Sequence, residues 1–191
     1  MSARFVVLSG CSGGGKSALL AELARRGHAV VEEPGRRIVQ AERAEGGTAL
    51  PWIDLAAFAR RAIALALADR AAAQGQPGWV FFDRGLVDAA AALEHATGEP
   101  ALERLGRAHR YHGTVFLTPP WPELYATDAE RRHSLADAIA EHQRLRRAYA
   151  RLAYRSLELP RIGIAARADA LLRALRDAPL PVPPAGSAGQ S

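Results

Sequence analysis

Short apolar runs alternate along this chain with longer segments whose apolar residues recur at helical spacing. The runs predict strands, and the one before Asp83 is apolar throughout, which is typical of a strand buried on both faces. The predicted strands cover residues 5–9, 29–31, 79–82, 114–118 and 154–159. The predicted helices cover residues 17–26, 36–43, 53–74, 86–96, 101–109, 134–155 and 165–176. Because strands and helices alternate, we expect an α/β fold in which helices cover both faces of a five-stranded parallel sheet.

Length and local composition predict one folded domain followed by a tail. A chain of 191 residues is long enough for a single domain with a sizeable core. Beyond Asp177 no charged residue remains, and prolines lie among Gly, Ser and Ala. We therefore expect residues 1–177 to form the domain and residues 178–191 to be a disordered tail.

The segment between the first predicted strand and the first predicted helix matches the phosphate-binding pattern G-x-x-x-x-G-K-[ST]. It consists of Gly10, Cys11, Ser12, Gly13, Gly14, Gly15, Lys16 and Ser17. Glycines allow backbone N–H groups to turn toward phosphate oxygens, and the start of a helix adds the positive end of its dipole. Lys16 would neutralise the β- and γ-phosphates of a nucleotide, and the Ser17 hydroxyl would bind Mg²⁺.

The composition supports a phosphate-binding role for this loop and bears on which classes of partner are expected. Lys and Arg total 25, yet Lys16 is the only lysine, and a compact ammonium suits a phosphate site better than a planar guanidinium. The net charge is +5, but the arginines are interspersed with 20 acidic residues, so nucleic acid is not the expected main partner. The absence of Asn removes the usual side-chain code for guanine and favours ATP over GTP.

The expected compartment is the cytoplasm. Cys11 is the only cysteine, so no intramolecular disulfide can form. The apolar run at residues 5–8 is too short for a signal peptide, and the most apolar stretch, residues 55–68, is interrupted by two arginines. We therefore expect no membrane span.

The buried strand at residues 79–82 is followed by Asp83, Arg84 and Gly85. A carboxylate in this place resembles the Walker B residue, which contacts Mg²⁺ directly or through water. In AAA+ and ABC ATPases a Glu usually follows this Asp. An Arg in that position is similar to small-molecule and nucleotide kinases, where it contacts the acceptor or the transferred phosphate. The alternatives are a helix N-cap for Asp83 and an ordinary ion pair for Arg84.

The second predicted strand ends in Glu32, Glu33 and Pro34. Ligands of open α/β sheets bind beyond the carboxyl ends of the strands, so a carboxylate here faces the same crevice as the phosphate-binding loop. A Glu within reach of an acceptor hydroxyl can take its proton. A Glu before Pro in this place is the base of deoxynucleoside kinases, and this resemblance indicates Glu33 rather than Glu32. The alternative is a pair of solvated acids.

Residues 121–134 look like a lid. A proline break is followed by Thr127, Asp128 and the run Glu130-Arg131-Arg132. A lid that closes over the phosphates would exclude water and supply an Arg to stabilise transition-state charge. We expect Arg131 to take that role, and the alternative is the start of a surface helix.

An arginine face is predicted on the helix at residues 134–155. It would consist of Arg144, Arg147, Arg151 and Arg155, near the C-terminal end of that helix. The helix dipole is sufficient reason for cations in this place. Binding of a lipid headgroup or of a nucleic acid is the alternative.

In this order, the motifs resemble the NadR-like family of P-loop proteins, small AAA-labelled ATP-binding domains related to ribosylnicotinamide kinase. The resemblance covers residues 1–176. It rests on the Gly-rich loop, Glu33-Pro34 with Arg36-Arg37, Phe82-Asp83-Arg84-Gly85 with Asp88, residues 127–132, and Leu157-Glu158-Leu159-Pro160. It implies a P-loop kinase fold with strand order 2-3-1-4-5, and ATP and Mg²⁺ as cofactors.

We therefore interpret the chain as an ATP-dependent enzyme that transfers the γ-phosphoryl group to a small hydroxylated acceptor. By resemblance alone, that acceptor would be nucleoside-like. Two other functions stay open. One is a nucleotide-dependent switch or slow NTPase that acts through a protein or lipid partner, and the other is a nucleic-acid-associated ATPase, whose activity would depend steeply on salt.

Overall fold

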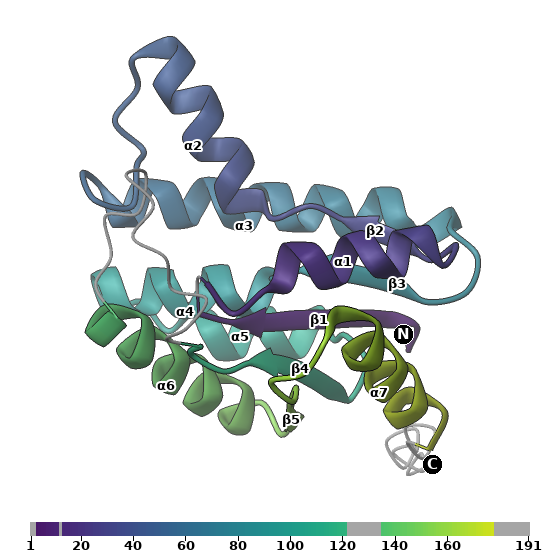
Figure 1. The fold of residues 1–191 in the computed structure, drawn as a ribbon. Coiled ribbons are helices and arrows are strands. Elements are labelled where there is room, and N and C mark those ends of the chain that lie inside the picture. Colours follow the sequence, from purple (N-terminus) through teal and green to yellow (C-terminus); the bar gives the residue numbers. More distant parts are fainter. Residues whose placement is uncertain (1–2, 12, 122–134, 178–191) are drawn as a thin grey trace, which may run out of the picture.

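The computed structural model of the protein describes residues 3–11, 13–121 and 135–177. Within these ranges the chain forms one sheet with helices on both faces (Figure 1). Several predictions concern residues outside this part: Ser12, Arg131, the predicted lid apart from Trp121, and the predicted tail at 178–191.

The sheet is parallel throughout, with strand order β2-β3-β1-β4-β5, as the resemblance implies. The strands are β1 (Phe5–Gly10), β2 (Ala29–Val31), β3 (Val80–Asp83), β4 (Thr114–Thr118) and β5 (Arg155–Glu158). The three inner strands, β3, β1 and β4, are buried along their whole length, because both of their faces are covered by helices. The edge strands β2 and β5 are only partly buried or exposed.

Two hydrophobic clusters lie on opposite faces of the sheet. The helices are α1 (Lys16–Arg25), α2 (Pro34–Glu45), α3 (Leu55–Ala72), α4 (Leu86–Thr97), α5 (Ala101–Ala108), α6 (Leu135–Arg151) and α7 (Ile164–Asp177), with a 3-10 turn at Ala73–Gly75. Residues of α1 and α7 pack on one face, and residues of α3, α4, α5 and α6 pack on the other. Helix α2 runs away from the sheet beside the start of α3 (Figure 1). None of the helices in the described ranges is both long and apolar enough to cross a bilayer.

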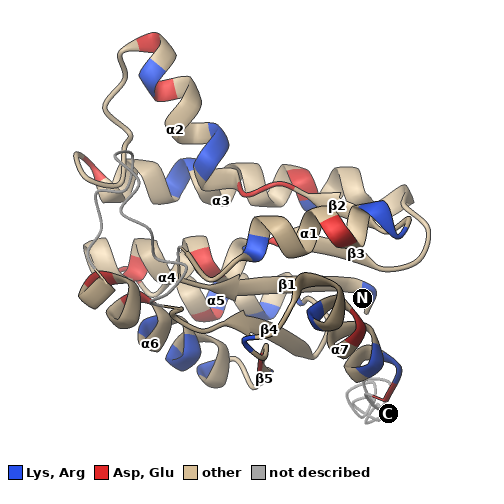
Figure 2. Cartoon of the chain, viewed as in Figure 1, with Lys and Arg blue, Asp and Glu red and all other residues tan. Residues whose placement is uncertain are grey.

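The predicted arginine face is wrong at its last residue, because the boundary between α6 and β5 lies before Arg155. Helix α6 ends at Arg151, and Ala153 adopts a left-handed conformation with φ 54°, which turns the chain into β5. Arg155 is therefore the first residue of a strand and does not continue the face of Arg144, Arg147 and Arg151. The basic residues that gather on the C-terminal half of α6 (Figure 2) are partly neutralised, because Arg151 forms an ion pair with Glu94 at 2.5 Å.

Candidate active site

The predicted site residues lie at the carboxyl ends of neighbouring strands. The phosphate-binding loop follows β1, Asp83 ends β3, and Glu33 follows β2. Since all strands are parallel, these ends meet at the same edge of the sheet. The charges of Lys16, Asp83, Glu33 and Arg84 interact electrostatically, which places the four side chains in one site.

Close packing explains why the loop contains glycines. A Cβ atom added to Gly14 would lie 2.6 Å from Oγ1 of Thr118 on β4, and one added to Gly10 would lie 2.3 Å from the Thr118 carbonyl oxygen. Gly15 is the N-cap of α1 and adopts the left-handed conformation, with φ 75°. Helix α1 has neither a side-chain cap nor an acidic residue in its first turn. Its first N–H groups are therefore available to an anion.

Lys16 folds back onto the loop from which it projects. Its side chain is buried, and Nζ donates to the carbonyl oxygen of Cys11 at 2.9 Å and to that of Gly10 at 3.5 Å. Burial lowers the pKa of Lys16, and the neighbouring Arg84 lowers it further. The ammonium group therefore gains from an anion that would replace these two carbonyls.

Cys11 is a packing residue of the loop. Its side chain is fully buried, and burial raises the pKa of the thiol. A thiol with a raised pKa is a weak nucleophile, so the thiol itself contributes no reactive group to the site.

Asp83 and Ser17 offer the oxygen ligands that Mg²⁺ prefers. Asp83 is 5% exposed, and its Oδ1 has no hydrogen-bond partner among the described residues. Burial raises the pKa of Asp83, although Lys16 opposes this shift. Ser17 Oγ accepts a hydrogen bond from Arg36 Nη2 at 3.1 Å. A buried carboxylate oxygen without a donor fits a cation, and one carboxylate with a hydroxyl suffices for an ion that also binds phosphates.

Arg84 connects three elements beside the phosphate-binding loop. Its Nε lies 3.0 Å from Glu33 Oε1, and its Nη1 donates to Glu141 Oε1 on α6 at 2.9 Å. Burial would raise the pKa of Glu141, but Arg84, together with Lys16 and Arg144, outweighs burial and holds that pKa below its usual value. Arg84 also has φ 59°, a conformation that costs energy for a residue with a side chain and that persists where its surroundings enforce it.

A buried polar layer supports the backbone at Arg84. Asp88, in the first turn of α4, accepts hydrogen bonds from Ser9 Oγ, from Tyr149 Oη at 2.6 Å and from the Gly85 amide at 3.0 Å. Arg84 Nη1 lies 4.0 Å from the same carboxylate. Asp88 thus joins β1, α4 and α6 directly behind the site.

The structure adds residues that sequence reasoning did not assign. Arg36 and Asp88 occur in the motifs that carry the family resemblance, but no role was given to them. Glu141, which contacts Arg84, matches no motif and lies far from its partner in the sequence. The same holds for Arg167, whose Nη2 donates to the Gly14 carbonyl at 3.1 Å. Asp83 is not the N-cap of α4, since that position is Gly85.

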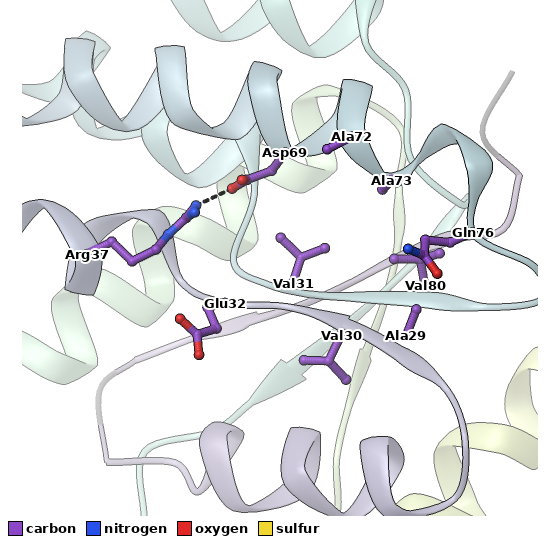
Figure 3. A pocket seen from close by; sticks show the side chains of 10 residues that line it. All are labelled: Ala29, Val30, Val31, Glu32, Arg37, Asp69, Ala72, Ala73, Gln76 and Val80. Atoms are coloured by element: carbon purple, nitrogen blue, oxygen red, sulfur yellow. Dashed lines mark hydrogen bonds and ion pairs between the residues drawn. The ribbon is translucent and has the colours of Figure 1, made fainter.

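A separate hollow of about 490 Å³ lies at the β2 edge of the sheet (Figure 3). Apolar side chains of β2 and α3 line it, and the ion pair between Arg37 and Asp69 lies at its rim. It contains neither the phosphate-binding loop nor Asp83 or Arg84, so it is not part of the candidate active site.

Asp83→Asn is expected to stabilise the free protein by about 1 kcal/mol at pH 7. The raised pKa means that burial disfavours ionised Asp83 in the folded state, so the cost exists at neutral pH and disappears below the usual aspartate pKa of 3.8. Thermal unfolding should also show that Mg²⁺ adds less stabilisation to the ATP complex of this variant. Asp169→Asn is the matched control, because Asp169 is half-exposed and paired with Arg26. Equal melting temperatures and equal Mg²⁺ effects in Asp83→Asn and the wild type would contradict the assignment.

Comparison with known proteins identifies a matching family and similar folds. A family model described as an AAA domain matches residues 5–167. No curated protein matches the chain. The chain superposes on the structure of NadR protein in complex with NR with a TM-score of 0.69 at 22% identity, covering 92% of this chain and 51% of that one. The chain therefore spans about half the length of the NadR chain.

Smaller kinases share the fold over nearly their whole length. Deoxyadenosine kinase from M. mycoides, with the products dCMP and dCDP bound, matches with a TM-score of 0.61 at 12% identity, covering 91% of this chain and 100% of that chain. Shikimate kinase from Acinetobacter baumannii matches with a TM-score of 0.54 at 17% identity, covering 91% of this chain and 93% of that one. The fold is therefore that of P-loop kinases, and the resemblance drawn from the motifs is confirmed.

Proposed function

Because the chain belongs to the AAA domain family and has the fold of P-loop kinases, we propose that it transfers the γ-phosphoryl group of ATP to a hydroxyl group of a small acceptor. The observation that carries this proposal is the position of Arg84. It links Glu33 and Glu141 beside Lys16, so that a cation and carboxylates face the phosphate-binding loop from the acceptor side.

The nucleotide would occupy the loop between Gly10 and Ser17. The N–H groups at the start of α1 would bind the phosphates, and Lys16 would exchange its two carbonyl contacts for phosphate oxygens. Ser17 and Asp83 would hold Mg²⁺, which neutralises charge on the phosphates when bound. Arg36 must then release the Ser17 hydroxyl, which leaves its guanidinium near the phosphates.

Glu33 is the proposed base for the acceptor. As the acceptor oxygen bonds to the γ-phosphorus, the bond between that phosphorus and the bridging oxygen breaks and ADP leaves. The proton of the acceptor hydroxyl passes to the Glu33 carboxylate. Arg84 holds Glu33 in place through the contact of 3.0 Å and adds positive charge where negative charge develops.

The sequence around Asp83 supports a kinase over a hydrolase. A residue that activates water usually follows the Walker B carboxylate in ATPases, but Arg84 occupies that position here. A nucleoside-like acceptor is the acceptor we favour, because NadR bound to NR and deoxyadenosine kinase bound to dCMP share this fold. We place this reaction in the cytoplasm.

Glu33→Gln is expected to lower acceptor-dependent ADP release by about 10²-fold, because glutamine cannot take the proton. ATP affinity should change little, since Glu33 forms its ion pair with Arg84. Glu32→Gln is the matched control, because Glu32 is the exposed neighbour of Glu33. ADP release is measured with Mg-ATP and a panel of nucleosides, nucleotides and small alcohols.

The outcomes of this comparison separate the proposed functions. Equal loss in both variants, or none in Glu33→Gln, would remove Glu33 as the base. If ATP binds but no acceptor raises the basal rate, the protein is a slow NTPase or a nucleotide-dependent switch. Stimulation by DNA or RNA would instead indicate a nucleic-acid-associated ATPase.

A further inference from the structure

Arg167 has an unusual environment for an arginine. It lies in the first turn of α7, is 2% exposed, and is among the largest fully buried side chains of the described residues. No carboxylate forms an ion pair with it anywhere in the described ranges, and its Nε has no hydrogen-bond partner there. Its pKa is lowered by burial alone. Burial of a guanidinium is costly, so the contacts that Arg167 does form need an explanation.

Arg167 contacts the phosphate-binding loop. Its Nη2 donates to the carbonyl oxygen of Gly14 at 3.1 Å, and its guanidinium carbon lies 5.7 Å from the ring centre of Trp121, which follows β4. The adjacent residue Ala168 belongs to the hydrophobic cluster that α7 shares with α1. The guanidinium is thus fixed between the packed body of α7 and the loop.

The hydrogen bond to Gly14 also determines where the next amide points. A trans peptide group is planar, and its C=O and N–H bonds point in opposite directions. Because the Gly14 carbonyl points at Arg167, the N–H group of Gly15 points away from α7. Gly15 is the N-cap of α1, so this amide adjoins the free N–H groups of the first helical turn.

We propose that Arg167 is a positioning residue of the phosphate-binding loop, which holds the peptide between Gly14 and Gly15 with its N–H group toward the nucleotide phosphates. The inference rests on the proposed function only in that a nucleotide occupies the loop. Gly14 and Gly15 have no side chains to restrain this peptide, and Gly15 already adopts φ 75°. Without the guanidinium, the Gly14 carbonyl loses this donor, and the orientation of the amide would have to be fixed again when phosphate binds.

The test compares Arg167→Met with Arg173→Met. Methionine replaces the guanidinium by a neutral chain of similar length, and Arg173 is an exposed arginine of the same helix. The dissociation constant for ADP should rise about ten-fold in Arg167→Met, which corresponds to ~1.4 kcal/mol. It should stay unchanged in Arg173→Met. The melting temperature of Arg167→Met should fall little, because an apolar side chain replaces a buried charge.

A merely structural role would give the opposite result. Arg167→Met would then melt at a lower temperature, while the folded molecules would bind ADP as tightly as the wild type, and this result would overturn the proposal. If the Met variant does not fold, Arg167→Leu is the second variant, since leucine is also apolar and has no donor for the Gly14 carbonyl. ADP affinity equal to that of the wild type in Arg167→Leu would then contradict the proposal. If the wild type itself fails to bind ADP, the proposed function fails with it.

Discussion

Lys16→Ala is expected to reduce ATP turnover on the order of 10³-fold, which is the loss expected for a principal group that stabilises transition-state charge. Lys16 is the only lysine, its ammonium is buried in the loop, and burial already lowers its pKa. Removal of this buried charge should leave the melting temperature of the free protein unchanged or slightly raised. ADP release and thermal unfolding, measured on the same sample, therefore separate a lost function from a lost fold.

Lys16→Arg is the control for charge alone. The Lys16 ammonium reaches the Cys11 carbonyl at 2.9 Å inside a tightly packed loop, and a planar guanidinium is too large for that place. We therefore expect Lys16→Arg to stay within about ten-fold of the alanine variant. Turnover near that of the wild type in either variant would mean that the loop does not bind the transferred phosphate.

Arg84→Met should lower turnover by about 10³-fold, a loss typical of arginines that stabilise a transferred phosphoryl group. It should also destabilise the fold by about 3 kcal/mol, because Glu33 and Glu141 would lose their shared cation. The pKa of Glu141 is held below its usual value of 4.5, so the pair stabilises the fold above that pH and loses this effect as the pH falls. The difference in stability between Arg84→Met and the wild type should therefore be full at pH 7 and shrink below pH 4.5.

A double variant separates stability from catalysis at this position. In Arg84→Met with Glu141→Gln, one of the two partner carboxylates is neutral, so part of the lost stability should return. Turnover should not return, because the cation beside Glu33 is still missing. Turnover that recovers together with stability would show that Arg84 acts only through the fold.

Local signals were sufficient to predict the order of elements and the residues at the strand ends. The apolar run before Asp83 is a strand buried on both faces, and Gly10 and Gly14 pack against Thr118 as a tight loop requires. Each of these features is encoded by residues that are adjacent in the sequence, or by the fact that helices cover both faces of the sheet. The strand order β2-β3-β1-β4-β5 is implied by the family resemblance and not by these local signals.

One of the features that sequence reasoning missed is local, and the others depend on distant segments. The turn after α6 is formed at Ala153, which adopts a positive φ although alanine rarely does so. Because nothing in the local pattern indicates this turn, the predicted helix extends wrongly to Arg155. Glu141 reaches Arg84 across 57 positions, and Arg167 reaches Gly14 across 153. Such contacts are formed by the packing of α6 and α7 on the sheet, and no local pattern encodes them.

The most direct test of the central claim is transfer of the γ-phosphoryl group itself. ATP labelled at the γ-phosphate is incubated with Mg²⁺ and a panel of nucleosides, nucleotides and small alcohols, with the wild type and with Lys16→Ala. We expect that one acceptor gains the label as ADP is released, and that Lys16→Ala abolishes both. Label that appears only in inorganic phosphate, or remains in bound ATP with every acceptor, would contradict it.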